Sequence, residues 1–172
     1  MSVLESERLI LRPARPPDVA AMTVWLGDYD VAKMLARVPY PYGESDAESF
    51  IALAEPHRFA IQRKQDGLFM GMIGLYAEDD YEFGYWLGKP FWGRGYATEA
   101  ARRLVSYAFM ELDRETVHAG WFYDNPASGN VLAKLGARHN GSRMRDCLAR
   151  GHKVLCHEML LTRADFLRQE AA

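Results

Sequence analysis

The stretch YEFGYWLGKPFWGRGYATEAARRL, residues 81–104, decides the fold of this 172-residue chain. Aromatic and aliphatic side chains over residues 81–87 predict a strand, and Gly93 and Gly95 predict a tight turn after it. Apolar residues then recur at helical spacing over residues 97–112, which predicts a helix with one buried stripe. Such a junction aims free backbone N–H groups and the positive end of a helix dipole at one point, so it suits a phosphate.

Two familiar phosphate-binding motifs do not match this turn. A P-loop needs GxxxxGK followed by Ser or Thr, and the chain contains none. The dinucleotide fingerprint GxGxxG would need a glycine where Thr98 stands, and it normally lies in a parallel βαβ unit. The two glycines alone fit a purely structural connection equally well, so their function depends on the surrounding sequence.

The rest of the chain alternates strand and helix patterns in an order that indicates the fold class. Further strands are expected over residues 8–13, 58–63, 68–76, 116–122, 142–148 and 154–161. Further helices are expected after Pro16, around 31–35, over 45–53 and after Asn125. This order predicts one α+β domain over residues 1–172, with a mixed, mostly antiparallel sheet of about seven strands flanked by helices.

Three short signals set expected boundaries. Asp66-Gly67 is a strong hairpin signal between two of the strands. Ser45 is a candidate N-cap with Glu48 as its capping-box partner. Asn125 is expected to cap a helix that has Pro126 in its first turn and that stops at Gly136.

Bulk composition excludes several classes of function. The formal net charge is −2, from 21 Lys and Arg against 23 Asp and Glu, so no global basic field attracts nucleic acid or anionic lipid. No apolar run approaches the roughly 20 residues that cross a bilayer, and no signal-peptide pattern opens the chain, so we expect a cytoplasmic protein. Cys147 and Cys156 lack disulfide or metal-ligand spacing, and the five histidines show no ligand pairing, so no metal site is predicted.

The run Trp92-Gly93-Arg94-Gly95-Tyr96-Ala97 resembles the coenzyme-binding motif of the GNAT superfamily of N-acetyltransferases, Gln/Arg-x-x-Gly-x-Gly/Ala. Trp92 replaces the usual Gln or Arg, which is typical of the branch resembling ribosomal-protein N-terminal acetyltransferases, whose members share the wording WGxGYATEA. ERLILRP at residues 7–13 and DNPASGNVLAKLGA at 124–137 also resemble that branch. The resemblance implies a GNAT-like fold and transfer of acetyl from acetyl-coenzyme A to an amine.

The resemblance also implies which residues bind the coenzyme. Backbone amides would hold its pyrophosphate at Trp92, Gly93, Arg94, Gly95, Tyr96, Ala97 and Thr98. The strand edge at Tyr85, Trp86 and Leu87 would pair with its pantetheine arm, and Asn125 would contact the same arm besides capping its helix. Arg94, Arg102 and Arg103 are candidate partners of the phosphates, although a solvated helix face explains the last two equally well.

Gly84 gives an independent reason to expect a cleft at this strand. A glycine inside a strand often marks a bulge, and a bulge here would splay the strand at 81–87, the fourth, from the fifth at 116–122. The alternative is that Gly84 makes room for a bulky neighbour.

Attack of a neutral amine on a thioester requires a proton acceptor and stabilisation of the oxyanion. Glu82 is the candidate base, because the family often places a glutamate near the start of this strand; Asp80 and a base acting through ordered water are the alternatives. Backbone N–H groups around Trp86 and Leu87 would stabilise the oxyanion. Many GNAT enzymes protonate the thiolate with a tyrosine where this chain has Leu132, so Ser128 is the expected replacement.

The acceptor amine is not specified by the sequence. Protein N-termini, amino acids, polyamines and aminated antibiotics stay open, and the loop at 38–43 with its neighbouring helices is expected to shape the acceptor site. The paired late strands are candidates for a homodimer interface. The competing functions are a GNAT-like domain that binds acyl-coenzyme A without turnover and another kind of nucleotide-binding protein.

Overall fold

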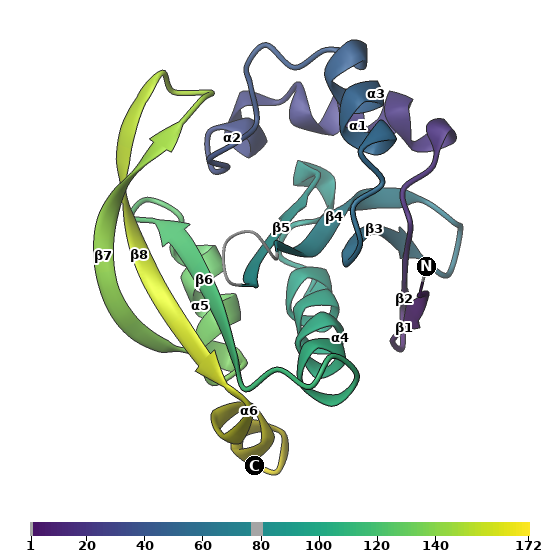
Figure 1. Ribbon diagram of the computed structural model, residues 1–172. Helices are drawn as coiled ribbons and strands as arrows, with labels where there is room; N and C mark the ends of the chain where they lie inside the picture. The colour runs from purple at the N-terminus through teal and green to yellow at the C-terminus, as the bar shows by residue number, and fades with distance from the viewer. Residues whose placement is uncertain (1, 77–80) are drawn as a thin grey trace.

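The computed structural model describes residues 2–76 and 81–172 and contains one mixed sheet of eight strands (Figure 1). In sheet order β1-β2-β3-β4-β5-β6-β8-β7, every neighbouring pair is antiparallel except β5 and β6, which are parallel. The strands are β1 (Leu4–Glu5), β2 (Leu9–Arg12), β3 (Arg58–Arg63), β4 (Phe69–Tyr76), β5 (Glu82–Leu87), β6 (Thr116–Phe122), β7 (Arg138–Cys147) and β8 (His152–Thr162). The predicted α+β class and mostly antiparallel sheet are confirmed, with β1 added to the seven expected strands.

Helices cover both faces of this sheet. They are η1 (Pro16–Asp18), α1 (Val19–Leu26), α2 (Tyr29–Ala32), α3 (Glu44–Ala52), η3 (Lys89–Phe91), α4 (Tyr96–Met110), α5 (Pro126–Lys134) and α6 (Arg163–Glu170). The buried residues of α4 and α5 belong to the largest apolar cluster, which also contains Phe83 of β5 and Val117 of β6. A second cluster joins α1 and α3 to the other face, at Met72 of β4 and the partly buried Trp86 of β5. The sheet therefore separates α4 and α5 from α1 and α3.

Several element boundaries differ from those expected. The prediction that Ser45 caps α3 is wrong: Gly43 is the N-cap, and its N–H donates to the Asp46 carboxylate at 2.8 Å, so Asp46 takes the part expected of Glu48. α2 begins at Tyr29 rather than near residue 31, because the Asp28 side chain accepts from the N–H of Asp30 and caps it there. Both late strands are longer than expected.

The sheet opens between β5 and β6, as predicted. The ladder between these strands contains Glu82 opposite His118 and Phe83 opposite Ala119, although β5 continues to Leu87 and β6 to Phe122. The predicted bulge at Gly84 is wrong, since the register between β4 and β5 continues without a shift through that residue. β5 and β6 therefore diverge after Phe83 and Ala119 without a bulge in β5.

Gly84 instead makes room for a bulky neighbour, which was the alternative explanation. A Cβ at this position would lie 3.1 Å from Cε2 of Tyr76, closer than side chains ordinarily pack. The glycine therefore leaves room for the Tyr76 ring beside β5 on the face that carries Glu82.

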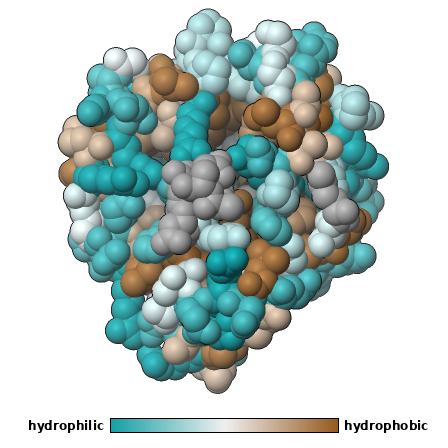
Figure 2. Space-filling view, viewed as in Figure 1, coloured by the Kyte–Doolittle hydropathy of each residue, from teal (hydrophilic) through white to brown (hydrophobic). Residues whose placement is uncertain are grey.

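The surface seen in Figure 2 mixes hydrophilic and hydrophobic residues without a continuous apolar band. None of the helices within residues 2–76 and 81–172 has the length and apolar character needed to span a membrane. In the same part of the chain, no three His, Cys, Asp or Glu side chains gather in a way that would hold a metal ion.

Candidate active site

The turn between β5 and α4 has the backbone geometry of an anion-binding loop. Gly93 and Gly95 have φ of 70° and 79°, in the left-handed region that other L-residues rarely adopt. Gly95 is the N-cap of α4, whose 15 residues begin with a run of N–H groups that have no partner within the helix. The helix dipole adds about half a positive charge there. The sequence-predicted residues from Trp92 to Thr98 are thus gathered around one helix start.

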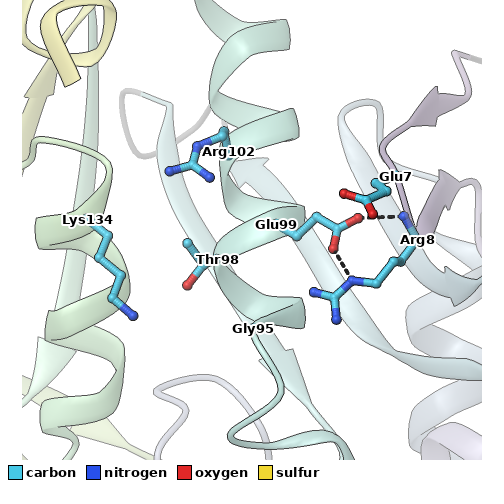
Figure 3. A pocket seen from close by; sticks show the side chains of 7 residues that line it. All are labelled: Glu7, Arg8, Gly95, Thr98, Glu99, Arg102 and Lys134. Carbon is cyan, nitrogen blue, oxygen red and sulfur yellow. Dashed lines mark hydrogen bonds and ion pairs between the residues drawn. The ribbon is translucent and has the colours of Figure 1, made fainter. Parts of the chain in front are cut away.

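An open pocket of about 530 Å³ lies directly beside this helix start (Figure 3). Lys134 of α5 extends into the space across from Thr98 and Arg102 of α4, so cations from both helices line it. Arg102 also pairs with Glu170 at 2.7 Å on the exposed side. Of the two helix arginines considered for the phosphates, Arg102 lines the pocket, whereas Arg103 pairs with Glu111 at 3.1 Å. Lys134 was not singled out from the sequence.

Arg8 and Glu99 brace the same turn from the side of β2. The Glu99 carboxylate accepts from the Ser6 hydroxyl, from the backbone N–H of Arg8 and from Nε of Arg8, each at 2.7 Å. Arg8 also donates to the carbonyl of Arg94 at 3.1 Å and lies 4.4 Å from the centre of the Tyr96 ring. Burial opposes ionisation of Glu99, but the hydrogen bonds from Arg8 and Ser6 outweigh it and lower the pKa of this carboxyl. The turn is therefore held by the ion pair of Arg8 and Glu99, in which each charge balances the other.

Trp92 fixes the other side of the turn. Its indole Nε1–H donates to the carbonyl of Leu87 at 2.8 Å, which ties the turn to the last residue of β5. This contact uses the side chain that replaces the usual Gln or Arg of the motif. It belongs to the turn's own structure. The backbone N–H of Trp92 also donates within the turn, to the carbonyl of Lys89 at 3.2 Å, so Trp92 does not offer the free amide that the sequence predicted.

The strand edge facing β6 is available beyond Phe83, where the described ladder ends. Alternation along β5 places Tyr85 on the side of α4 and α5, whereas Trp86 packs on Phe69 on the opposite side, with ring centroids 6.0 Å apart. Tyr85, Trp86 and Leu87 thus present their backbone at the opening, as expected for a strand that pairs with an extended ligand.

The first turn of α5 lies across the opening from Tyr85. Asn125 is its N-cap, as predicted, and Oδ1 of Asn125 accepts from the N–H of Ser128 at 3.4 Å. Burial raises the pKa of the Tyr85 phenol, and an interaction with the Ser128 side chain partly opposes the rise. Ser128 and Tyr85 therefore meet where β5 and β6 diverge. Pro126 in the first turn and Gly136 after the last turn are also as predicted.

Glu82 lies on the opposite face of the opening and is paired with Arg145 of β7. Two hydrogen bonds join them, from Nη1 to Oε1 and from Nη2 to Oε2, the second at 2.7 Å. The two side chains are only 17% and 18% exposed, and Glu82 raises the pKa of Arg145. The alternative base Asp80 lies outside the described residues. Arg145, 63 positions along the chain, carried no signal in the sequence.

A sheet that opens beside a glycine turn, with strand edge exposed in the gap and cations at the helix start, is the arrangement expected of a protein that binds an acyl-coenzyme A. The family model of the acetyltransferase (GNAT) domain matches residues 8–138 of this chain. The chain therefore belongs to the GNAT family of acetyl-CoA-dependent acetyltransferases.

Individual relatives agree with this assignment. YoaA of Bacillus subtilis (strain 168), named as an uncharacterized N-acetyltransferase, is 30% identical over 156 residues, which cover 81% of this chain and 84% of YoaA. YdaF of the same strain, named as a candidate ribosomal N-acetyltransferase, is 35% identical over 103 residues, covering 57% of this chain and 56% of YdaF. The fold resembles that of Mycobacterium smegmatis RimJ in complex with CoA-disulfide, with a TM-score of 0.80, 20% identity and coverage of 99% and 94%.

Proposed function

We propose that this protein transfers acetyl from acetyl-coenzyme A to a primary amine by direct attack of the amine on the thioester. The observation that carries the proposal is the early end of the β5–β6 ladder at Phe83 and Ala119, next to the turn at Gly93 and Gly95. A pantetheine arm laid along Tyr85 to Leu87 would reach the turn with its pyrophosphate. Its thioester would then lie near the point where the two strands diverge.

The charges around the turn support the proposed binding of phosphate. The N–H groups from Gly93 to Thr98 would hold the pyrophosphate, and Arg102 and Lys134 would pair with the outer phosphate oxygens. Arg8 neutralises Glu99, so this carboxylate would not repel the ligand. Asn125 would contact the pantetheine arm from the start of α5.

Glu82 is proposed as the proton acceptor, directly or through an ordered water. Arg145 occupies one lone-pair site on each carboxylate oxygen, which leaves a second site on each for the amine or the water. A carboxylate that is hydrogen-bonded to a guanidinium is a weak base, so it suits an amine that is already partly deprotonated at neutral pH. An α-amine of pKa about 8 is roughly one-tenth neutral at pH 7, whereas a lysine amine of pKa about 10.4 is almost fully charged. We therefore favour an α-amine, as found at a protein N-terminus or on an amino acid.

The remaining steps use groups at the opening of the sheet. N–H groups of β5 near Trp86 and Leu87 would stabilise the oxyanion of the tetrahedral intermediate. Ser128, supported by Tyr85, would donate a hydrogen bond to the leaving thiolate in place of the tyrosine that Leu132 replaces. Ser128→Ala should then lower kcat with unchanged affinity for the coenzyme, which steady-state kinetics and calorimetry would check.

A domain that binds acyl-coenzyme A without turnover is the competing function. An amine panel that contains peptides with free N-termini, amino acids, polyamines and aminoglycosides distinguishes the two, with thiol release as the signal. Release of coenzyme A that depends on one amine class supports the transferase. Normal coenzyme binding with no amine-dependent release by the folded protein supports the binding domain instead.

Two further properties accompany this proposal. We expect the protein to work in the cytoplasm, where acetyl-coenzyme A is available. A homodimer through β7 is also proposed, because β7 ends the sheet and its residues 138–144 are exposed on both faces. Light scattering after size exclusion would give twice the 19.6 kDa chain mass for the dimer and the single mass for a monomer.

A further inference from the structure

Arg150, at the tip of the β7–β8 hairpin, joins two segments that belong to different halves of the molecule. Its Nε donates to the carbonyl of Lys33 at 2.7 Å, just after α2. Its two terminal nitrogens donate to the Asp124 carboxylate at 2.8 and 3.0 Å, in the turn between β6 and α5. The Arg150 side chain is 11% exposed and that of Asp124 is 33% exposed, and the two parallel hydrogen bonds define the geometry of the pair.

The same hairpin tip holds the segment after α2 through two more residues. The N–H of Leu148 donates to the carbonyl of Ala36 at 3.1 Å, and the Cys147 thiol lies 3.4 Å from the carbonyl of Leu35. Figure 1 shows the hairpin curving toward α2 at this point. Three neighbouring hairpin residues therefore fasten one short segment, residues 33–36.

α2 is also tied to the other half of the sheet. Asp30 pairs with Lys89 of η3, which follows β5 directly and precedes the coenzyme-binding turn. The segment of residues 29–36, which contains α2, is thus tied to the β5 side of the opening through Lys89 and to the β6 side through Arg150. It lies on the face of Glu82, because its buried Val31 packs in the cluster with α1 and α3.

Asp124 connects Arg150 to the first turn of α5, which contains Ser128. It directly precedes Asn125, whose side chain caps α5 and accepts from the N–H of Ser128. Arg150 beside it lowers the pKa of Asp124, so the pair stays charged at neutral pH. A shift of Asp124 would carry the start of α5 with it.

We infer that Arg150 is a positioning residue for acetyl transfer: by holding Lys33 and Asp124 together it sets the distance between the acceptor side at α2 and the first turn of α5. The catalytic part of this inference rests on the transferase function proposed above. In that reaction the amine comes from the side of α2 and Glu82, whereas the thiolate leaves toward Ser128. Both must be held in one geometry, and a displacement of about 1 Å costs up to roughly 100-fold in rate.

The test compares Arg150→Ala and Arg150→Lys with a matched control, Arg163→Ala. Arg163 has the same kind of contacts, from Nε to the carbonyl of Arg114 at 3.1 Å and from Nη2 to Asp113 at 2.8 Å. These contacts join α6 to the end of α4, away from the opening of the sheet. Lysine keeps the charge of Arg150 but cannot reach both acceptors with a planar fork.

The first readout is amide hydrogen exchange of the free protein, which needs no turnover. Arg150→Ala should speed exchange several-fold in residues 29–36 and 123–128, Arg150→Lys should do so less, and Arg163→Ala should leave both segments unchanged. A folded Arg150→Ala protein with parental exchange in these segments would overturn the inference. This readout decides the point even if no amine is acetylated, so a failure of the proposed function is recognised separately.

The second readout is kinetic, with whichever amine the parent protein acetylates. Arg150→Ala should lower kcat/KM for the amine roughly 10- to 100-fold. The dissociation constant of coenzyme A should stay within about twofold, and Arg150→Lys should recover part of the loss. If Arg150→Ala and Arg163→Ala give equal kinetics, Arg150 stabilises the fold without positioning the reaction.

Discussion

At the scale of single residues, Glu82 carries the base chemistry of the proposed mechanism. Glu82→Gln should lower kcat about 100-fold, because the amide cannot take the proton. The dissociation constant of acetyl-coenzyme A should not change, since Glu82 lies on the face opposite α4 and α5. Steady-state kinetics over a range of pH checks this prediction.

Glu158 is the matched control for that experiment. It pairs with Arg143 of β7 at 2.9 Å, points to the same face of the sheet as Glu82 and is similarly shielded. Glu158→Gln should therefore keep the parental kcat. If Glu82→Gln retains the parental pH–rate profile, the base is another group.

Gly95 sets the conformation of the turn that is proposed to bind the coenzyme. Gly95→Val forces a branched residue into φ of 79° and should cost about 1–2 kcal/mol of folding stability. It should also weaken acetyl-coenzyme A binding by at least about tenfold, equivalent to about 1.4 kcal/mol, because the N–H groups of the turn lose their aim. Calorimetric titration measures the second effect.

Gly141 separates strain from ligand binding. It has φ of 98° and lies on β7, where a Cβ would meet no atom of the described residues within 4 Å. Gly141→Val should lose stability to a similar extent and bind the coenzyme normally. Equal losses of affinity in both variants would show that Gly95 has no specific role at the pyrophosphate.

At the scale of elements, Glu99 links the start of β2 to α4 and makes the link sensitive to acid. Its folded-state pKa lies below the ordinary value of 4.5, so the folded protein binds fewer protons than the unfolded chain at acidic pH. The stabilisation is complete above pH 4.5 and is lost as the pH falls through the lowered value. Glu99→Gln should cost about 1–2 kcal/mol at pH 7.

Urea unfolding as a function of pH tests this link. The stability difference between parent and Glu99→Gln should shrink as the pH falls below 4.5, because the parent loses its charged hydrogen bonds there. A difference that stays constant down to about pH 3 would contradict the assigned role of the Arg8–Glu99 pair.

Most helices and strands were predicted from the sequence, because hydrophobic periodicity, turn residues and helix caps involve residues close together in the chain. The strand, glycine turn and helix of residues 81–104 and the cap at Asn125 depend on neighbours within a few positions, and all are present. β1 was missed because two residues carry no periodicity, and α6 was missed because its buried face amounts to one residue, Phe166. The cap of α3 was misassigned because Ser45 and Gly43 are both plausible N-caps by type.

The sequence predicted those parts of the candidate site in which a single side chain or a short stretch of backbone makes the interaction by itself. The turn at Gly93 and Gly95 belongs to that class. Arg145 and Arg150 do not, since each acts through a partner 63 or 26 positions away in the chain. Such pairs depend on sheet order and on the curvature of the β7–β8 hairpin, which hydrophobic patterns do not encode.

At the scale of the whole molecule, one sheet is divided into two halves by the short parallel ladder of β5 and β6. α4 and its turn offer positive charge at one end of the opening, and α2 with the β7–β8 hairpin spans the opposite face. In the proposed mechanism, this architecture provides separate approaches for an anionic coenzyme and for an amine. Loss of the amine approach would leave a binding domain without transferase activity, whereas loss of the coenzyme approach would remove binding and transfer together.

Calorimetric titration of acetyl-coenzyme A into the purified protein, with desulfo-coenzyme A, ATP and NAD as comparisons, tests the central claim most directly. The account predicts one coenzyme per chain, bound at micromolar concentrations and more tightly than ATP or NAD. Absence of coenzyme binding by demonstrably folded protein would contradict it, because the glycine turn at the start of α4 would then be purely structural.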